Sequence, residues 1–230
     1  MRLQDKVVVV TAATRGIGEA IVKACAEEGA IAYIGARNME RAQAEADELT
    51  AQGLRVKCVY SDAGKPESHQ SMIDAVVAAE GCIDVFVNNF GDTNLAEDKD
   101  LLSATYEHFL AGVDANVGSV FLGCQVAARE MAKTGGSIVS ISSFAGTVPD
   151  ISQIAYGTAK AAINHMTKSM AVQLARMNIR VNAVPGHDRH RCGGRQPLRG
   201  VQAVLPASYP ARADGHAPAN RRCRGVLRRR

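Results

Sequence analysis

Tyr156, Lys160 and Ser143 are residues whose types and spacing suit acid–base chemistry. Tyr156 and Lys160 lie four residues apart, and Ser143 lies thirteen residues before Tyr156. Residues 160–176 predict a helix, and if that helix includes Tyr156, the two side chains leave the same face about one turn apart. A positive charge beside a phenol favours the phenolate. The pair therefore predicts a group that exchanges a proton with an alcohol near neutral pH.

A second pattern, at the start of the chain, predicts a nucleotide site. The apolar residues 6–10 predict a buried strand, residues 11–18 a turn of small residues, and residues 19–29 a helix that ends near Gly29. A helix that begins after such a turn presents unpaired N–H groups and a positive dipole end to a diphosphate. Gly16 lets the backbone approach the phosphates, and Gly18 lets the helix pack closely on its strand. A tight turn without a ligand would have the same sequence, so this motif alone leaves both interpretations open.

Together, five ordered motifs resemble those of the short-chain dehydrogenase/reductase family. They are the glycine turn of residues 11–18, the Asn-Asn-Phe-Gly element of residues 88–91 after an apolar strand at 83–87, Asn116, Ser143 after a strand at 137–141, and the pair Tyr156 and Lys160. The resemblance covers residues 1 to about 184. It implies an α/β domain with a doubly wound parallel sheet, a Rossmann-like fold.

Two departures from the family pattern limit the sub-families of short-chain dehydrogenases that the chain can resemble. Ala12 replaces the first glycine of the turn, and Phe90 replaces the alanine of the Asn-Asn-Ala-Gly element. Residues 88–95 and 148–156 look most like bacterial 7α-hydroxysteroid dehydrogenases, which act on bile acids. The alternative is a short-chain reductase of another carbonyl, such as a 3-oxoacyl thioester.

The resemblance also implies a role for each site residue. Tyr156 would exchange the hydroxyl proton while the nicotinamide takes or gives a hydride, Lys160 would bind the nicotinamide ribose and lower the pKa of Tyr156, and Ser143 would hold the substrate oxygen. Asn116 would orient a water that relays protons to Lys160. Ser142 is adjacent, but the spacing to Tyr156 favours Ser143. The residues expected to contact the cofactor are Thr11, Thr14, Arg15, Gly16, Ile17, Gly18, Arg37, Asn38, Asp62, Asn89, Gly91, Tyr156 and Lys160.

The charges near the second expected strand favour NADP over NAD. In dinucleotide folds an acidic residue at the end of this strand binds the ribose 2′-hydroxyl, whereas an arginine accommodates a 2′-phosphate. Here the strand at 30–35 is followed by Ala36-Arg37-Asn38, with no acidic residue. Arg37 and Arg15 can form charge-assisted hydrogen bonds to a phosphate, although solvated surface arginines would look the same. Asp62 resembles the family's adenine-contacting acid, and a plain turn aspartate is the alternative.

Composition limits the remaining possibilities. The 230 residues suit one α/β domain with a large core. No apolar run approaches the roughly 20 residues that a membrane span needs, and residues 1–6 do not read as a signal peptide, so we expect a cytoplasmic protein. The six cysteines have no metal-ligand spacing, and no metal site is expected.

Residues 185–230 differ sharply from the rest of the chain. They contain eleven Arg, two Asp and no Lys or Glu, a net charge of +9, which leaves −5 on residues 1–184 of a chain whose total is +4. They also hold five of the seven prolines and lack Ile, Met and Phe. This composition predicts a disordered Arg/Pro-rich tail after a domain formed by residues 1–184.

Three explanations compete for this tail. A basic arm would bind nucleic acid through its arginines, and His187, His190 and Cys192 would be candidate metal ligands; no aromatic or structured pattern supports either. We favour the third, a reading-frame error after Val184. Members of the family place one further residue between Arg-Val-Asn-Ala-Val and Pro-Gly, whereas here Val184 runs directly into Pro185.

A frame error would have functional consequences. The fold would be C-terminally truncated, lacking its last strand and the helices behind it, which would expose a sheet edge and weaken the homo-oligomer that the family would form. The residues that close over the nicotinamide would also be lost. A catalytically inactive product is therefore a further alternative to a steroid dehydrogenase with a small-molecule substrate.

Overall fold

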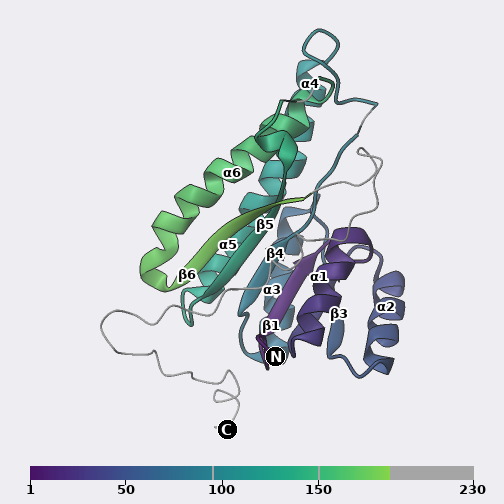
Figure 1. The fold of residues 1–230 in the computed structure, drawn as a ribbon, viewed down its shortest axis with the longest axis vertical. Coiled ribbons are helices and arrows are strands. Elements are labelled where there is room, and N and C mark those ends of the chain that lie inside the picture. Colours follow the sequence, from purple (N-terminus) through teal and green to yellow (C-terminus); the bar gives the residue numbers. More distant parts are fainter. Residues whose placement is uncertain (95, 150, 187–230) are drawn as a thin grey trace.

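A six-stranded parallel sheet forms the centre of the molecule. The computed structural model describes residues 1–94, 96–149 and 151–186. Within them the strand order is β3-β2-β1-β4-β5-β6, and all neighbouring strands are parallel. The strands are β1 (Val7–Thr11), β2 (Ile31–Ala36), β3 (Val56–Tyr60), β4 (Val85–Asn88), β5 (Gly136–Ser143) and β6 (Ile179–Gly186). This confirms the doubly wound, Rossmann-like fold (Figure 1).

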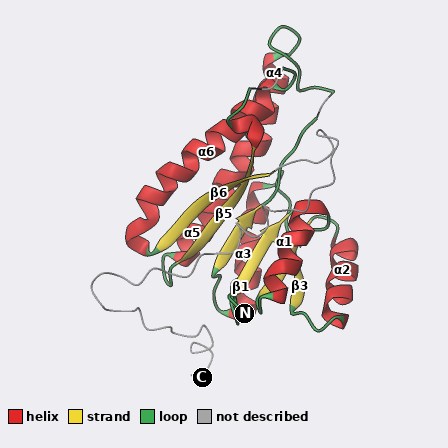
Figure 2. Cartoon of the chain, in the orientation of Figure 1, coloured by secondary structure: helices red, strands yellow, loops and turns green. Residues whose placement is uncertain are grey.

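Helices connect successive strands, as parallel pairing requires. They are α1 (Gly16–Glu27), α2 (Met39–Ala51), α3 (Pro66–Glu80), α4 (Tyr106–Val113), α5 (Ser119–Met131) and α6 (Ile154–Leu174). A π-helical turn (Asp114–Gly118) joins α4 to α5, and short 3₁₀ turns lie at Phe144–Gly146 and Ala175–Met177. Figure 2 shows the helices flanking the central strands.

Two hydrophobic clusters, one on each face, hold the layers together. Alternate strand residues such as Val8 and Val10 pack against buried residues of α1 and α2. Their neighbours Val7 and Val9 join the other cluster, with buried residues of α3, α5 and α6. Every residue of β1 is buried, because this strand lies centrally and both of its faces are covered. The apolar run that predicts a strand at the start of the sequence is therefore the middle of the core.

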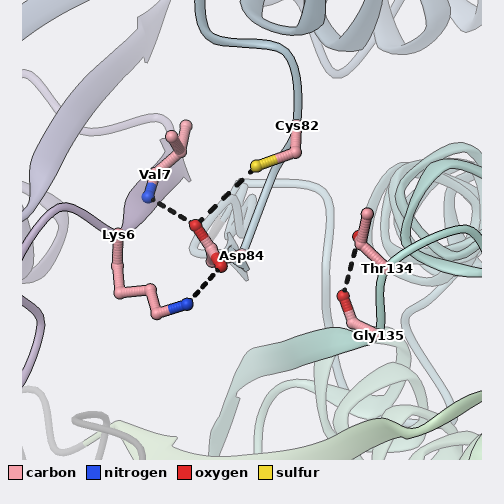
Figure 3. A network of polar contacts seen from close by, with 6 residues as sticks. All are labelled: Lys6, Val7, Cys82, Asp84, Thr134 and Gly135. Atoms are coloured by element: carbon pink, nitrogen blue, oxygen red, sulfur yellow. Dashed lines mark hydrogen bonds and ion pairs between the residues drawn. The ribbon is translucent and has the colours of Figure 1, made fainter. Parts of the chain in front are cut away.

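Asp84 ties three strands together at the amino end of the sheet. Its carboxylate accepts hydrogen bonds from Lys6 Nζ at 2.8 Å and from Val7 N at 2.9 Å (Figure 3). Its backbone N–H donates to Val7 O at 3.0 Å, and its backbone oxygen accepts from Ser137 N at 2.9 Å. These contacts fix the relative heights of β1, β4 and β5, whose opposite ends carry the candidate site residues.

The edge strand β6 ends at Gly186, two residues beyond the domain boundary expected from the sequence. Pro185 and Gly186 pair with Ser142 and Ser143 of β5. Among residues 1–186 that the structure describes, β6 lies at the edge of the sheet, a position where proline is tolerated. The expectations about the tail, its disorder, His187, His190, Cys192 and the loss of later elements, concern residues 187–230 and lie outside the described residues.

One continuous helical segment is long and apolar enough to span a membrane by length and composition alone. It covers Tyr106–Met131, with a mean hydropathy of 1.3 in its most apolar window. From the sequence we expected no such segment, since no apolar run approaches the roughly 20 residues that a membrane span needs. In the structure, Val120, Cys124 and Met131 of this segment belong to the hydrophobic core. A helix that packs in a protein core can have the length and hydropathy of a membrane span.

Candidate active site

The glycine turn lies between β1 and α1, and its two glycines have different reasons to be there. Gly16 has a φ of +61°, and a Cβ built on it would meet nothing within 4 Å, so this side of the turn is open. A Cβ on Gly18 would lie 2.5 Å from Asn89 Nδ2 and 2.7 Å from Ala13 Cα. Gly18 therefore permits a close approach of the helix to the turn and to the neighbouring loop, whereas the sequence predicted a close approach to the strand.

The other turn residues expected to contact a cofactor surround this opening. Arg15, which precedes the first residue of α1, is exposed, and Thr14 and Ile17 are half-buried. Ala12, at the position of the missing glycine, has a φ of +51°. That is the left-handed region, in which alanine costs about 1 kcal/mol. The substitution noted in the sequence is therefore accommodated by backbone strain.

Thr11 and Asn89 join the ends of β1 and β4. Thr11 Oγ1 accepts hydrogen bonds from Asn89 N at 3.0 Å and from Phe90 N at 3.3 Å, and donates to Val87 O at 3.4 Å. Asn89 Nδ2 donates to Ala12 O at 3.0 Å. The strand order reverses between these two strands, and ligands of open α/β sheets bind at that crevice.

The residues expected near the adenosine end follow β2 and β3. Arg37 is exposed directly after β2. Asn38 caps α2, because its Oδ1 accepts from Arg41 N at 2.9 Å. Asp62 Oδ1 accepts from Gly64 N at 3.1 Å, so this carboxylate stabilises its own turn. Both interpretations of Asp62 offered by the sequence, turn residue and adenine contact, remain compatible with this geometry.

Asn116 is almost fully buried in the π-helical turn between α4 and α5. Its Oδ1 accepts from Asp92 N at 3.1 Å, and its Nδ2 donates to Asp92 O and Gly112 O, both at 2.9 Å. The side chain thus holds the loop that follows β4. π-Helical turns are rare and occur frequently at functional sites.

Lys160 lies at the centre of the candidate site. It is 2% exposed, its Nζ donates to Ile141 O at 3.0 Å, and the same Nζ lies 5.4 Å from the centroid of the Tyr156 ring. A Cβ on Gly91 would lie 3.2 Å from Lys160 Nζ and 3.6 Å from Asn116 Oδ1. The structure therefore brings together Tyr156, Lys160, Asn116 and Gly91. Burial lowers the pKa of Lys160 to about 8.

Tyr156 and Lys160 share one helix face, as their spacing predicts. The helix begins at Ile154, six residues before the stretch that predicted it, so Tyr156 belongs to its first turn. Tyr156 is half-buried, whereas Lys160 is covered. An ammonium one turn below a phenol favours the phenolate.

Ser143 and Ser142 end β5 with different environments. Ser142 is buried, and its hydroxyl donates to Asn164 Oδ1 at 2.6 Å. Ser143 is half-buried, and its Oγ accepts from Ala145 N at 3.2 Å, which leaves its hydroxyl hydrogen available to donate. The preference for Ser143 over Ser142 is thus supported by accessibility. Asn164, which also donates to Gly146 O at 3.3 Å, was missed by the sequence analysis because no local pattern marks it.

Asp98 is a second residue that the sequence analysis missed. Its Oδ1 accepts from Ala155 N and its Oδ2 from Tyr156 N, both at 2.9 Å. The contact joins residues more than fifty positions apart, so a search for short-range motifs does not find it. It lies directly beside the candidate proton-transfer residue.

The described residues fit a bound nicotinamide dinucleotide at this edge of the sheet. The open Gly16 turn leads into α1, whose first backbone N–H groups suit a diphosphate. Gly91 leaves space beside Lys160 and Asn116 that a side chain would fill. Among the described residues no group of three His, Cys, Asp or Glu side chains is placed to hold a metal ion.

The chain is similar to known proteins both in sequence and in fold. The sequence model of the short chain dehydrogenase family matches residues 6–187. A 7alpha-hydroxysteroid dehydrogenase of Clostridium sardiniense is 43% identical over 225 residues, covering 96% of this chain and 82% of that protein. A 3-oxoacyl-acyl-carrier-protein reductase of Chlamydia muridarum is 35% identical over 187 residues, covering 80% and 74%. The crystal structure of a short-chain type dehydrogenase/reductase from Mycobacterium marinum is 36% identical, with a TM-score of 0.74 over 80% of this chain and 74% of that one.

Proposed function

Because the chain belongs to the short-chain dehydrogenase/reductase family, a family of NAD(P)-dependent oxidoreductases, we propose that it interconverts a steroid hydroxyl and its ketone. The proposed substrate is a 7α-hydroxy bile acid, and the proposed cofactor is NADP. The observation that carries the chemistry is the buried Lys160 ammonium, 5.4 Å from the Tyr156 ring centroid.

In the oxidation direction, Tyr156 is the proposed general base. Its phenolate removes the proton from the oxygen of the substrate hydroxyl, while a hydride leaves the carbon that bears this hydroxyl and a carbonyl forms. Bound nicotinamide supplies the hydride acceptor. The Ser143 hydroxyl donates a hydrogen bond to the substrate oxygen and holds it near the phenol. In reduction the proton moves back from Tyr156 to the developing alkoxide.

Lys160 and Asn116 support this proton transfer. With a pKa of about 8, the Lys160 ammonium is mostly charged at neutral pH and stabilises the Tyr156 phenolate. We propose that Lys160 also binds the nicotinamide ribose and that Asn116 orients a water toward Lys160. Asn116 uses its side chain to fix the Asp92 backbone, so its buried oxygen lies close to the Lys160 region.

Exposed apolar side chains beside the catalytic helix support an apolar substrate. Phe144, Val148 and Ile151 are 50%, 59% and 95% exposed, and all three lie between Ser143 and Tyr156 in the sequence. A steroid ring system offers the apolar surface that such side chains cover. The name of the Clostridium sardiniense relative specifies the 7α-hydroxyl within this class.

Arg15 and Arg37 support NADP as the cofactor. Both are exposed, one before α1 and one after β2, and no acidic residue follows β2 directly. Replacing Arg37 by Asp should therefore raise the KM for NADP⁺ at least about tenfold and lower the KM for NAD⁺. An Arg37→Asp variant with an unchanged ratio of the two KM values would contradict the assignment. Lys65, exposed beyond β3, provides the matched charge-reversal control as Lys65→Asp.

The direct test is NADP⁺ reduction by the purified chain with a 7α-hydroxy bile acid. We expect turnover that falls at least about a thousandfold in Tyr156→Phe, because the phenolate base is lost. Ser142→Ala and Ser143→Ala should differ, with the larger loss of kcat at Ser143. Equal activity of wild type and Tyr156→Phe would contradict the mechanism.

The similarity to 3-oxoacyl-acyl-carrier-protein reductase supports a second candidate function, reduction of a 3-oxoacyl thioester. NADPH oxidation with a 3-oxoacyl thioester, measured beside the bile acid, separates the two by their kcat/KM values. A folded chain that turns over neither substrate would favour an inactive product.

A further inference from the structure

We propose that Asp98 is a positioning residue that fixes the first turn of α6, and with it the Tyr156 phenol, relative to the loop that carries Gly91. This inference rests on the proposed function, because it assigns a role in proton transfer by Tyr156. Both carboxylate oxygens of Asp98 accept hydrogen bonds from the helix. The donors are the consecutive backbone N–H groups of Ala155 and Tyr156, each at 2.9 Å.

The start of α6 has no capping group of its own. Gln153, the residue before the helix, makes no side-chain capping bond, and the first turn contains no acidic residue. An uncapped helix end leaves its first N–H groups without partners and its dipole uncompensated. Asp98 supplies both an acceptor and a negative charge from a distant part of the chain. Lys99 O adds a third contact, accepting from Ile154 N at 3.2 Å.

Three described residues that follow β4, Gly91, Asp92 and Asp98, contact the candidate site. The Asn116 side chain makes two hydrogen bonds to the Asp92 backbone. A Cβ built on Gly91 would lie 3.2 Å from Lys160 Nζ. Asp98 accepts a hydrogen bond from the backbone N–H of Tyr156. Asp98 thus holds the backbone that carries the phenol, while Gly91 and Asp92 lie against Lys160 and Asn116. A change at Asp98 should move Tyr156 against the other members of the site, whereas a capping residue elsewhere would affect stability alone.

Asp98→Ala and Asp98→Asn test this role, with Glu97→Ala as the matched control. Glu97 is an exposed carboxylate one residue away on the same loop. Asparagine keeps one carbonyl acceptor for one of the two amides, so Asp98→Asn should be intermediate. Two readouts are needed: hydrogen exchange of the peptide covering residues 154–160, and separate kcat and KM values.

For Asp98→Ala we expect amide exchange at Ala155 and Tyr156 to accelerate at least about tenfold. We also expect kcat to fall at least about tenfold, with the KM for NADP⁺ within about twofold of wild type. Glu97→Ala should change neither readout. A merely structural role would lower the melting temperature without this separation of kcat from KM.

Two results would overturn the proposal: unchanged exchange in the 154–160 peptide of Asp98→Ala, or a kcat no lower than that of Glu97→Ala. If Asp98→Ala fails to fold, Asp98→Asn carries the same test. If the wild-type chain itself shows no turnover, the proposed function fails, while hydrogen exchange still decides whether Asp98 fixes the start of α6.

Discussion

At the scale of single residues, the site concentrates groups that cost stability. Lys160 is the clearest case, because burial lowers its pKa from 10.5 to about 8. The unfolded chain binds this proton more tightly, so the folded state gains stability as pH rises from about 8 to about 10.5 and carries the full penalty below pH 8. Strongly shifted pKa values cluster at functional sites, which agrees with the role proposed for Lys160.

Replacing Lys160 by Met should therefore abolish activity and increase the stability of the folded state. We expect the free energy of unfolding at pH 7 to rise by about 1–3 kcal/mol, because the desolvated ammonium is gone and Met fills a similar volume. Turnover should be lost. Denaturant unfolding between pH 7 and 10 tests the cause, since the difference between the two proteins should shrink with rising pH. Lys133→Met, at an exposed lysine, is the control. If the difference in free energy of unfolding between wild type and Lys160→Met does not change with pH, the explanation is wrong.

Ala12 is a second strained residue, and it predicts a stabilising substitution. Its φ of +51° suits glycine better than alanine. Ala12→Gly should raise the free energy of unfolding by about 0.5–1 kcal/mol, the relief of left-handed strain less the added chain entropy. Ala13→Gly, at a neighbouring alanine without a positive φ, should instead destabilise the protein. If Ala12→Gly lowers the melting temperature, the strain is not real.

At the scale of elements, the sequence predicts the positions of strands and helices that depend on neighbouring residues, and does not predict contacts between distant parts of the chain. The valine-rich run at the start predicts β1 because each of its residues is buried. The strand expected at 30–35 is likewise observed, one residue later, as β2 (Ile31–Ala36). Such local patterns do not reveal Asp98, because the cap of α6 comes from a loop far away in sequence. The π-helical turn at Asn116 was missed for the same reason: its side chain is fixed by Asp92 across the site.

The packing of α1 on β1 gives a prediction for this pair of elements. A Cβ on Gly18 would lie 2.7 Å from Ala13 Cα and 2.8 Å from Ala12 O, which are backbone atoms that cannot rotate away. Gly18→Ala should therefore cost about 1–3 kcal/mol of stability and weaken dinucleotide binding, because the start of α1 must move away from the turn. Gly64→Ala is the control, since its Cβ would meet only Asp62 Oδ1, at 3.5 Å. Thermal melts and fluorescence titration with NADPH measure both effects.

At the scale of the whole molecule, the candidate site depends on contacts that cross the sheet. The carboxyl ends of β1, β4 and β5 carry Thr11, Asn88 and Ser143. The order of the strands, which brings these ends together, follows from the family resemblance and not from any single motif. A small cavity beneath this edge, with room for about one water molecule, is lined by Thr11, Asn88, Phe90 and the buried His69, among others.

His69 makes the folded state sensitive to acid. Burial lowers its pKa, against smaller opposing effects of the Ala63 backbone and Asp62. Neither ring nitrogen has a hydrogen bond of normal geometry among the described residues. The unfolded chain therefore takes up this proton first as pH falls, so the stability contributed by neutral His69 is complete above about pH 6.5 and is lost below it.

His69→Gln should remove this dependence, because glutamine does not titrate. Between pH 7 and 5, the free energy of unfolding of the variant should fall less steeply than that of wild type, by up to about 1.4 kcal/mol per pH unit, the limit for one proton. His165→Gln, at an exposed histidine, is the matched control. Parallel pH profiles for wild type and His69→Gln would show that His69 is protonated as easily in the folded chain as in the unfolded one.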